Sequence, residues 1–339
     1  MAQSKAWTEP GPITVAPGVH RIPLPLPNDG LHAVNVYAIE DGDRLVLIDS
    51  GWALRESRDS LAAALRHLDR DLGDISRFLV THIHRDHYTQ AVALRREFGN
   101  RIALGIGEQP SLTGQLLTDE PQLTQHAEKL LSCGAKVVLD RIATAFDVTP
   151  EPGVWEEPDE WLSNDTVIEI GDRALRVVET PGHTQGHVVF VDDKAGLLFA
   201  GDHVLPHITP SIGFEAVIPD YPLRDYLESL KLVRAMPDLR LLPAHGQVAD
   251  SVHDRVDELL DHHERRLDTI AAALDAGAAN AYDVARLIGW TRRERHFDDL
   301  DPFNQMLAVL ETGAHLDLLV LRGRLRSTTI DGVAHYAVR

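Results

Sequence analysis

Four side chains able to bind a metal lie close together in the segment THIHRDH of this 339-residue chain. They are His82, His84, Asp86 and His87, and they directly follow the apolar run FLV at 78–80, which predicts a buried strand. Side chains alternate along an extended chain, so His82 and His84 point the same way, and the last two lie where a helix begins. Imidazole nitrogen and carboxylate oxygen are the donors of hydrolytic divalent sites. The spacing suits two adjacent metals.

Three further candidate ligands occur later in the chain. They are His183 in TPGHTQGH, Asp202 in FAGDH and His245 in LLPAHG, and each follows an apolar run and a turn containing glycine or proline. Loops beyond strand ends are held by a rigid sheet and stay open to substrate, as a metal hydrolase requires. A chance group of surface histidines is the alternative, and the repeated placement at strand ends argues against it.

In type and order these motifs resemble the metallo-β-lactamase superfamily, whose HxHxDH loop is followed by separate His, Asp and His motifs. The resemblance spans approximately residues 13–246 and implies an αββα sandwich, an α/β fold. It includes Asp49 in VLIDSG, which matches an early structural aspartate of the superfamily. We expect Asp49 to brace the site rather than to bind metal.

The resemblance also implies a binuclear centre with a bridging carboxylate. One metal would be bound by His82, His84 and His183, and the other by Asp86, His87 and His245. Asp202 would bridge the two metals. A water or hydroxide bridging the metals would be the nucleophile, because two cations lower its pKa and polarise the attacked carbonyl or phosphoryl group. Zn2+ is the most plausible ion, although iron and manganese accept the same ligands.

Three residues are candidates for roles beside metal binding. Asp86 would orient the hydroxide and so act in catalysis, in addition to binding metal. His187 and His203 would orient ligands or stabilise developing negative charge. An equal alternative for these two histidines is ordinary packing next to a polar site.

The substrate class divides into two alternatives. The commonest zinc β-lactamases have a cysteine where this chain has Asp202, and its single cysteine, Cys133, lies in an apolar segment typical of packing. Antibiotic hydrolysis is therefore not expected. The combination of a bridging aspartate with a full HxHxDH loop resembles the motifs of hydroxyacylglutathione hydrolases, lactonases and nucleases. We favour hydrolysis of a small ester, thioester or lactone, and the alternative is an endoribonuclease or other phosphodiesterase that binds RNA through its C-terminal domain.

Periodicity predicts two strand-rich halves separated by an insertion. Antiparallel strands are expected over 13–48, helices over 57–68 and 88–98, and strands again at 166–170, 175–179, 188–191 and 197–200. The segment 105–160 between the halves has weaker periodicity, with one amphipathic helix near 122–133. We interpret it as an insertion that could form a lid.

The C-terminal part has a different composition. Helical patterns over 251–277, 281–288 and 303–322 precede two β-prone runs joined at 330–332, which predicts a small winged-helix-like domain at 251–339 after a hydrolase domain at 1–250. Its basic clusters TRRERH and RGRLR are modest beside a net charge of −19. Nucleic acid is therefore not an expected partner. The apolar pattern at 303–321 is compatible with a homodimer.

Composition is that of a globular enzyme, with 44% hydrophobic and 25% charged residues. The sequence has neither the roughly 20 consecutive apolar residues of a membrane helix nor a start resembling a signal peptide, which predicts a cytoplasmic protein with a small-molecule substrate and no membrane partner. Trp52, Tyr88, Phe214 and Tyr221 lie near the predicted site in sequence. They would suit a pocket for a neutral acyl chain or ring, but ordinary core packing is the favoured interpretation.

Overall fold

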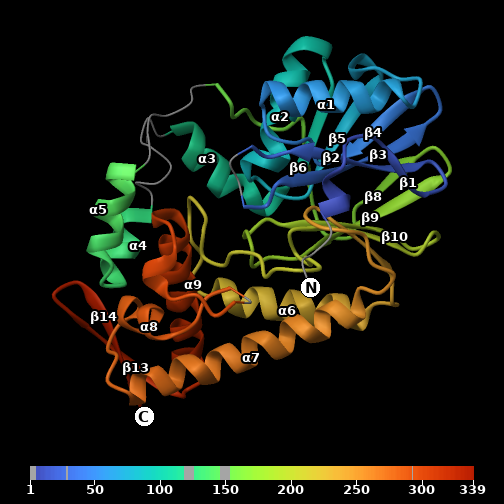
Figure 1. Cartoon of the computed structure of the whole chain (residues 1–339). Coiled ribbons are helices and arrows are strands. Elements are labelled where there is room, and N and C mark those ends of the chain that lie inside the picture. Colours follow the sequence, from blue (N-terminus) through green and yellow to red (C-terminus); the bar gives the residue numbers. More distant parts are fainter. Residues whose placement is uncertain (1–4, 28–29, 118–125, 146–152, 292) are drawn as a thin grey trace.

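Two β-sheets packed face to face form the centre of the molecule. The computed structural model describes residues 5–27, 30–117, 126–145, 153–291 and 293–339 (Figure 1). Within these ranges seven strands form one sheet, five form a second and two form a C-terminal hairpin. Helices α1 and α2 cover the outer face of the first sheet, and α6 and α7 cover that of the second. This is the predicted αββα sandwich.

The first sheet combines an antiparallel half with a parallel half. Its strands, in spatial order, are β1 (Ile13–Ala16), β2 (Val19–Pro25), β3 (Ala33–Asp41), β4 (Arg44–Ile48), β5 (Ile75–Val80), β6 (Arg101–Gly105) and β7 (Glu160–Leu162). The predicted meander is confirmed in β1–β4, and β4–β7 are parallel. Helices α1 (Arg55–Arg66) and α2 (Arg85–Phe98) follow β4 and β5. Because α2 starts at Arg85, before the predicted 88, Asp86 and His87 lie in its first turn.

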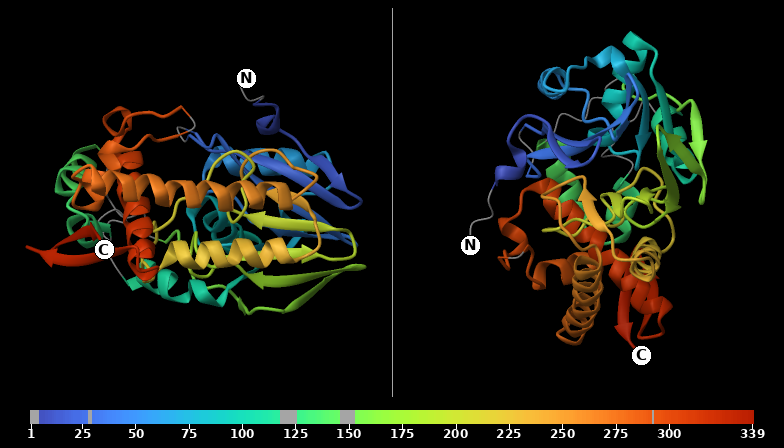
Figure 2. Two further views of the ribbon diagram at one scale, coloured as in Figure 1. Left: turned by 90° about the horizontal axis from the view of Figure 1, so that it is seen from below. Right: turned by 90° about the vertical axis from the view of Figure 1, so that its right-hand side faces the viewer.

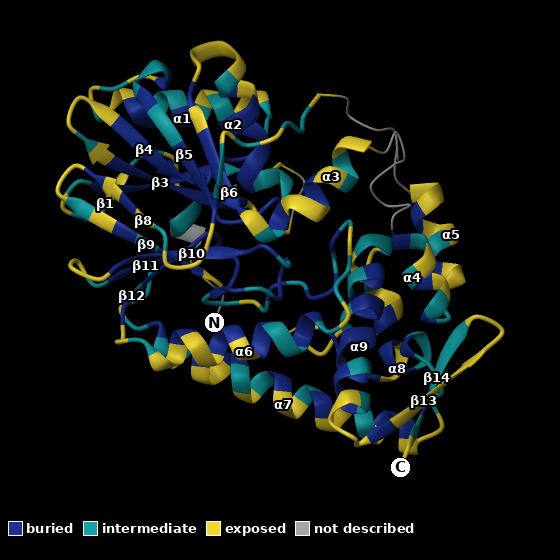
Figure 3. Cartoon of the chain, turned by 180° about the vertical axis from the view of Figure 1, so that it is seen from behind, coloured by how far each residue is buried: buried dark blue, intermediate teal, exposed yellow. Residues whose placement is uncertain are grey.

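The central strands of the second sheet are buried on both faces, whereas its edge strand β8 (Val167–Ile170) has exposed alternate positions. The strands of this sheet are β8, β9 (Arg173–Glu179), β10 (Val188–Asp192), β11 (Leu197–Gly201) and β12 (Arg240–Pro243). Along β10, Val188 and Phe190 face the first sheet, whereas Val189 and Val191 pack against the outer helices. This alternation explains why the strand is apolar at nearly every position, and the strands of both sheets are mostly buried in Figure 3.

Polar contacts join the two sheets at the end that carries His245. The amide nitrogen of buried Asn35 on β3 donates to the carbonyls of Pro243 at 3.0 Å and Gly246 at 2.8 Å. The Tyr37 hydroxyl donates to Pro243 at 2.8 Å. Since unsatisfied buried carbonyls are costly, these bonds fix the loop after β12 relative to the first sheet.

The segment 105–160 contains more helices than its periodicity predicts. They are η3 (Ile106–Glu108), α3 (Gln109–Leu117), α4 (Ala127–Ser132) and α5 (Lys136–Ala145). The helix predicted near 122–133 begins outside the described residues, and α4 corresponds to its later part. Short helices carry little periodic signal, so the sequence pattern does not predict α3 and α5. Helices α4 and α5 pack against α9, which ties this segment to the C-terminal helices.

The C-terminal elements lie close to their predicted positions. They are α7 (His253–Asp275), α8 (Ala281–Leu287), η5 (Phe297–Asp299), α9 (Pro302–Leu321), β13 (Leu325–Ile330) and β14 (Val333–Val338). Helices α6 (Pro222–Ala235) and α7 lie side by side, and α9 packs against both (Figure 2). One apolar cluster joins Leu230 of α6 and Leu241 of β12 to Leu259 and Leu319. The C-terminal helices therefore share a core with the second sheet, and a winged-helix module stays a prediction.

Two minor helices complete the elements, η1 (Lys5–Thr8) and η2 (Leu72–Asp74). No helix in the described ranges combines the length and the apolar character that crossing a membrane requires. Cys133, predicted to be a packing residue, is buried, and burial raises the pKa of its thiol to about 11. Its reactivity as a thiolate is correspondingly low.

Two buried histidines stack between α7 and α9. The rings of His263 and His315 are 5.3 Å apart, and the nitrogens Nδ1 of His263 and Nε2 of His315 are 3.1 Å apart. Nδ1 of His315 donates to the Glu311 carbonyl at 2.8 Å, so in the neutral pair its Nε2 accepts the bond from His263. Burial, followed by the neighbouring His315, holds the pKa of His263 well below its usual value, and burial lowers the pKa of His315 to about 3.

Acid should therefore destabilise the fold through this pair. Each histidine of the unfolded chain binds a proton near pH 6.5, whereas folded His315 stays neutral down to about pH 3, so stability is lost as pH falls below about 6.5. At pH 5 the loss from His315 is about 2 kcal/mol. The unfolding free energy of the wild type, measured by urea titration, should fall between pH 7 and pH 5. In His315→Leu this fall should be smaller by about 2 kcal/mol. Exposed His67→Gln is the control, and an unchanged pH dependence in the His315 variant would contradict the expectation.

Candidate metal centre

Four loops meet at one end of the β-sandwich and carry all of the predicted ligands. The loop after β5 and the first turn of α2 supply His82, His84, Asp86 and His87. The loop from β9 to β10 supplies His183, and the loops after β11 and β12 supply Asp202 and His245. Because each loop leaves a buried strand, the side chains are held by the rigid sheets.

The first group consists of three histidines and one aspartate oxygen. Nδ1 of His84 lies 3.1 Å from Nε2 of His82 and 3.0 Å from Nε2 of His183. Oδ2 of Asp202 lies 3.5 Å from Nε2 of His183. Four donor atoms thus surround one point.

The second group lies beside the first and uses the other oxygen of the same aspartate. Nε2 of His245 is 3.3 Å from Oδ2 of Asp86, and Nε2 of His87 is 3.5 Å from that oxygen. Oδ1 of Asp202 lies 3.4 Å from Nε2 of His245 and 3.7 Å from Nε2 of His87. Asp202 therefore directs one oxygen to each group.

The separations between these donor atoms suit shared coordination of a divalent cation better than direct hydrogen bonds between the side chains. A tetrahedral ion with bonds of about 2.0–2.1 Å holds its ligand atoms roughly 3.3 Å apart, close to the observed separations of 3.0–3.7 Å. Nε2 of His87, Nε2 of His245 and Oδ1 of Asp202 are buried and make no hydrogen bond among the described residues. Buried polar atoms are rarely left in that state. The residues present fit a two-metal centre.

The outward nitrogens of the histidines are held by the protein. Nδ1 of His183 donates to the Ser211 carbonyl, and Nδ1 of His245 donates to the Ala33 carbonyl, both at 2.8 Å. A carbonyl only accepts, so each Nδ1 carries a proton, and in the neutral ring Nε2 is the nitrogen left to face the centre. Nε2 of His84 similarly lies 3.4 Å from the Phe214 carbonyl.

Asp49 lies directly behind the centre. Its carboxylate accepts hydrogen bonds from the Thr81 backbone N–H at 2.8 Å and from the Thr81 hydroxyl at 2.9 Å, and it lies 3.0 Å from Nδ1 of His87. The Thr81 hydroxyl lies in turn 3.1 Å from Nδ1 of His82. Asp49 has a left-handed backbone with φ of 60°, a strained conformation that aspartate tolerates. One carboxylate thus orients a histidine in each group.

His187 and His203 occupy different environments. Nδ1 of His187 lies 2.9 Å from the Thr180 hydroxyl, and its Nε2 accepts the backbone N–H of Asp202 at 3.2 Å. A Cβ atom at Gly201, whose φ is +49°, would lie 2.7 Å from that Nε2, so the contact requires glycine. His203 is buried, with its ring 6.0 Å from that of His187 and 5.4 Å from that of Tyr226. Only His187 bonds to a ligand residue.

Carboxylates dominate the electrostatics of the second group. Burial opposes the charge on His87, but Asp86, Asp49 and Asp202 outweigh it and raise its pKa to about 10. Burial is likewise outweighed at His245, whose pKa rises to about 9 beside Asp202 and Asp86. Burial also opposes ionisation of Asp86, but His87 and His245 hold its pKa below its usual range. Asp86 is therefore a carboxylate at neutral pH.

Burial dominates the electrostatics of the first group. It lowers the pKa of His82 well below the usual value, and neighbouring histidines add to the effect. Burial and then His183 lower the pKa of His84 to about 3, and burial lowers the pKa of His183. Neutral imidazole is the form that binds metal, so these rings can coordinate an ion without first losing a proton.

Two buried glutamates connect the ligand loops, and sequence reasoning missed both. Glu108 in η3 accepts the Thr184 hydroxyl at 2.5 Å and lies 3.4 Å from the Ile83 N–H, and burial raises its pKa to about 7. Glu215 accepts the Gln185 N–H at 2.9 Å, and burial followed by Glu108 raises its pKa well above the usual value. Residues 83 and 184 adjoin candidate ligands, and residue 185 is two positions from His183.

The only sequence signal for Glu108 is its glycine neighbours. A Cβ atom at Gly105 would lie 2.3 Å from the Gly186 carbonyl, and one at Gly107 would lie 2.7 Å from the Gly186 Cα atom. Glycine therefore lets η3 approach the loop that bears His183. The pairing partner is remote in sequence, so this close approach is visible only in the folded chain.

The four aromatic residues near the predicted site have separate roles. Tyr88 is a core residue, because it is fully buried and its hydroxyl donates to the Glu156 carbonyl at 2.8 Å. Trp52 packs against the same core. The ring of Phe214 lies 5.9 Å from the ring of His84. The Arg224 guanidinium lies over the ring of Tyr221, 5.2 Å from the ring centroid. Of these four residues, only Phe214 has a described ring contact with a candidate ligand.

Comparisons with known proteins agree with this fold and site. The family model described as the metallo-beta-lactamase superfamily matches residues 29–245. The chain is 26% identical over 320 residues to the probable metallo-hydrolase YqjP of Bacillus subtilis strain 168, covering 88% of this chain and 90% of that protein. A metallo-beta-lactamase family protein from Thermus thermophilus aligns with a TM-score of 0.74 and 25% identity, covering 96% of this chain and 100% of that one. A beta-lactamase domain protein from Burkholderia ambifaria aligns with a TM-score of 0.74 and 27% identity, covering 97% of this chain and 95% of that one.

Fold and site together define a metal-dependent hydrolase. The superfamily match extends over more than half of the chain and includes the segment from Asp49 to His245. The chain belongs to the metallo-β-lactamase superfamily.

Replacing Asp49 tests the bracing contact. Asp49→Asn keeps the shape of the side chain but removes the charge that orients His87 and Thr81. Loss of such an outer contact typically weakens metal binding by about 10-fold to 100-fold. Competition with a chromophoric chelator should therefore show weaker Zn2+ binding in Asp49→Asn than in the wild type. Exposed Asp193→Asn is the matched control, and equal affinities for all three proteins would contradict the role.

Proposed function

We propose that this chain is a binuclear metal hydrolase that cleaves a small ester, thioester or lactone. The observation that carries the proposal is Asp202, whose two oxygens face two separate groups of histidine nitrogens. Divalent cations at such a centre supply a nucleophile at neutral pH and polarise the attacked carbonyl group. The chain therefore needs no serine or cysteine nucleophile.

In the proposed centre, the two groups of donor atoms hold one ion each. One ion would be held by His82, His84 and His183 and the other by Asp86, His87 and His245, and Asp202 would offer one oxygen to each. Zn2+ is the preferred ion because imidazoles make up most of the donor set, and Fe or Mn are the alternatives. The second group must lose protons from His87 and His245 to bind an ion, since their pKa values are about 10 and 9.

Asp86 is the proposed catalytic side chain. One of its oxygens lies 3.3 Å from His245, and the neighbouring histidines keep it ionised at neutral pH. Its side chain is 18% exposed, in contrast to fully buried His87 next to it. An ionised, accessible carboxylate can accept a hydrogen bond from the attacking water and orient it toward the substrate.

The neighbourhood of His84 favours a carbonyl substrate with an apolar part. The Phe214 ring lies 5.9 Å from His84, and the Phe303 ring lies 5.5 Å from Phe214. This pair offers an apolar surface for an acyl chain or ring beside the centre. His187 and Asp49 take the positioning roles, through Asp202 and His87 respectively.

The C-terminal charges argue against RNA as the substrate. Arg322 pairs with Glu264 at 2.9 Å, and Arg324 pairs with Asp268 at 2.9 Å, so two arginines beside the hairpin already face acidic partners on α7. The chain carries a net charge of −19, which repels a polyanion. A small molecule is therefore the proposed partner.

Metal analysis tests the centre. Wild-type protein purified without chelators should contain about two equivalents of Zn, Fe or Mn by elemental analysis, and His84→Ala should lose about one. The kcat/KM of His84→Ala should be at least about 100-fold below that of the wild type, because a charge that stabilises the transition state is lost. Circular dichroism should be unchanged, and His67→Ala should retain both metal and activity. One equivalent or none in the wild type would refute a binuclear centre.

A substrate panel separates the two substrate classes. Acyl thioesters, lactones and single-stranded RNA should be incubated with metal-loaded wild type and with Asp86→Asn. We expect hydrolysis of at least one carbonyl substrate, with kcat reduced at least about 100-fold in Asp86→Asn because the orienting carboxylate is gone. RNA should remain intact. Metal-dependent cleavage of RNA alone would overturn the choice of substrate class.

A further inference from the structure

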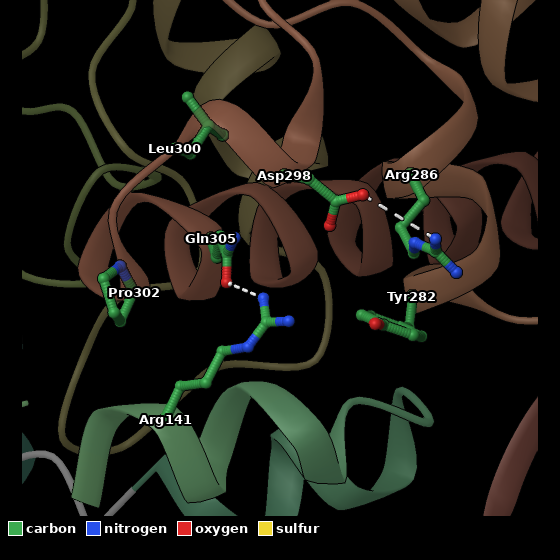
Figure 4. A pocket seen from close by; sticks show the side chains of 7 residues that line it. All are labelled: Arg141, Tyr282, Arg286, Asp298, Leu300, Pro302 and Gln305. Carbon is green, nitrogen blue, oxygen red and sulfur yellow. Dashed lines mark hydrogen bonds and ion pairs between the residues drawn. The ribbon is translucent and has the colours of Figure 1, made fainter. Parts of the chain in front are cut away.

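A cavity lies away from the metal ligands, between α5, α8 and the start of α9 (Figure 4). Its volume is about 530 Å³, within the range of small-molecule sites. Residues from three separate segments line it: Arg141 on α5; Tyr282 and Arg286 on α8; and Asp298, Leu300, Pro302 and Gln305. A cavity assembled from distant segments is a built feature of the tertiary structure.

Two guanidinium groups give this cavity a positive character. Arg141 donates to Oε1 of the neutral Gln305 amide at 2.8 Å, and no acidic side chain in the described part of the chain forms an ion pair with it. Arg286 lies 3.7 Å from Asp298, with side chains 50% and 65% exposed, and a solvated pair at that distance is weak. The lining thus carries two cations and one anion in a protein whose net charge is −19.

Gln305 holds Arg141 in a defined position. The Gln305 side chain is on the buried face of α9, and the residue is only 3% exposed. Its Nε2 donates to the Phe297 carbonyl at 3.2 Å, which fixes the amide so that its oxygen faces Arg141. Figure 4 shows the guanidinium of Arg141 directed toward this oxygen. A cation held in place before a ligand arrives loses little entropy on binding.

The remaining wall is apolar and flat. The Arg286 guanidinium lies over the Tyr282 ring, 5.7 Å from the ring centroid. The same ring packs edge-on against Phe297, with the two ring centroids 5.7 Å apart. Leu300 and Pro302 extend this wall. Guanidinium groups match the planar geometry of a carboxylate, and an aromatic ring accommodates a flat carbon skeleton.

We propose that this cavity is a binding site for a small organic carboxylate. The carboxylate pairs with Arg141 and Arg286, and the ring or acyl chain attached to it lies on Tyr282 and Leu300. The site uses no metal ligand, so it is distinct from the hydrolytic centre. Pro302 lines the cavity and is followed by Phe303, whose ring contacts Phe214 beside His84.

Benzoate is the probe for this site, and its neutral isostere benzamide is the control. Calorimetric titration of full-length, metal-loaded protein should show saturable benzoate binding and much weaker benzamide binding. Arg141→Gln on α5 and Arg286→Gln on α8 should each weaken benzoate binding about tenfold or more, because each removes a charged hydrogen bond. Lys136→Gln on α5, outside the cavity lining, should bind benzoate as the wild type does. Equal weakening by Lys136→Gln, or no saturable binding by the wild type, would overturn the site.

Two further titrations locate the bound benzoate and test its class. His84→Ala, which impairs the metal centre, should bind benzoate with unchanged affinity, and loss of binding in this variant would place benzoate on the metals and refute the proposal. Inorganic phosphate should compete only weakly, because it has no flat apolar part. Tighter binding of phosphate than of benzoate would overturn the carboxylate class. Thermal denaturation of both arginine variants should match that of the wild type, since both side chains are at the surface.

Discussion

The constraint on which this structure depends is the placement of one buried carboxylate, Asp202, between two groups of histidine nitrogens. Its oxygens lie 3.4–3.7 Å from three of those nitrogens, too far for good hydrogen bonds and at the spacing of atoms that share a cation. Buried donors in that arrangement are costly unless an ion joins them. The surrounding fold maintains this arrangement by fixing the opposite side of each ring.

Support for the centre extends outward in layers. Asp49 orients His87 and, through Thr81, His82, while backbone carbonyls orient His183 and His245. Farther out, Glu108 and Glu215 hold the loops themselves, and Asn35 and Tyr37 hold the end of β12. Most of these contacts cross between segments remote in sequence. The two sheets and their outer helices therefore act as one scaffold for the centre.

The C-terminal helices belong to the same scaffold. Helices α7 and α9 share an apolar cluster with α6 and with the second sheet, and α4 and α5 pack against α9. The cavity lined by Arg141 and Gln305 exists because α5, from the middle of the chain, rests on α9 near its end. This contact joins the segment 105–160 to the C-terminal region.

The sequence by itself determined most of the strands and the positions of seven candidate ligands, because strand alternation and the HxHxDH spacing are local patterns. The sequence also implied, through its resemblance to the superfamily, the αββα fold and the bracing role of Asp49. It did not determine which oxygen of Asp202 faces which group, that Glu108 and Glu215 connect the ligand loops, or that Tyr88 is a core residue and Phe214 lies beside His84. The short helices α3 and α5 likewise depend on tertiary packing. Contacts between residues far apart in the chain, such as Glu108 with Thr184, leave no periodic trace in the sequence and arise only when the sheets pack.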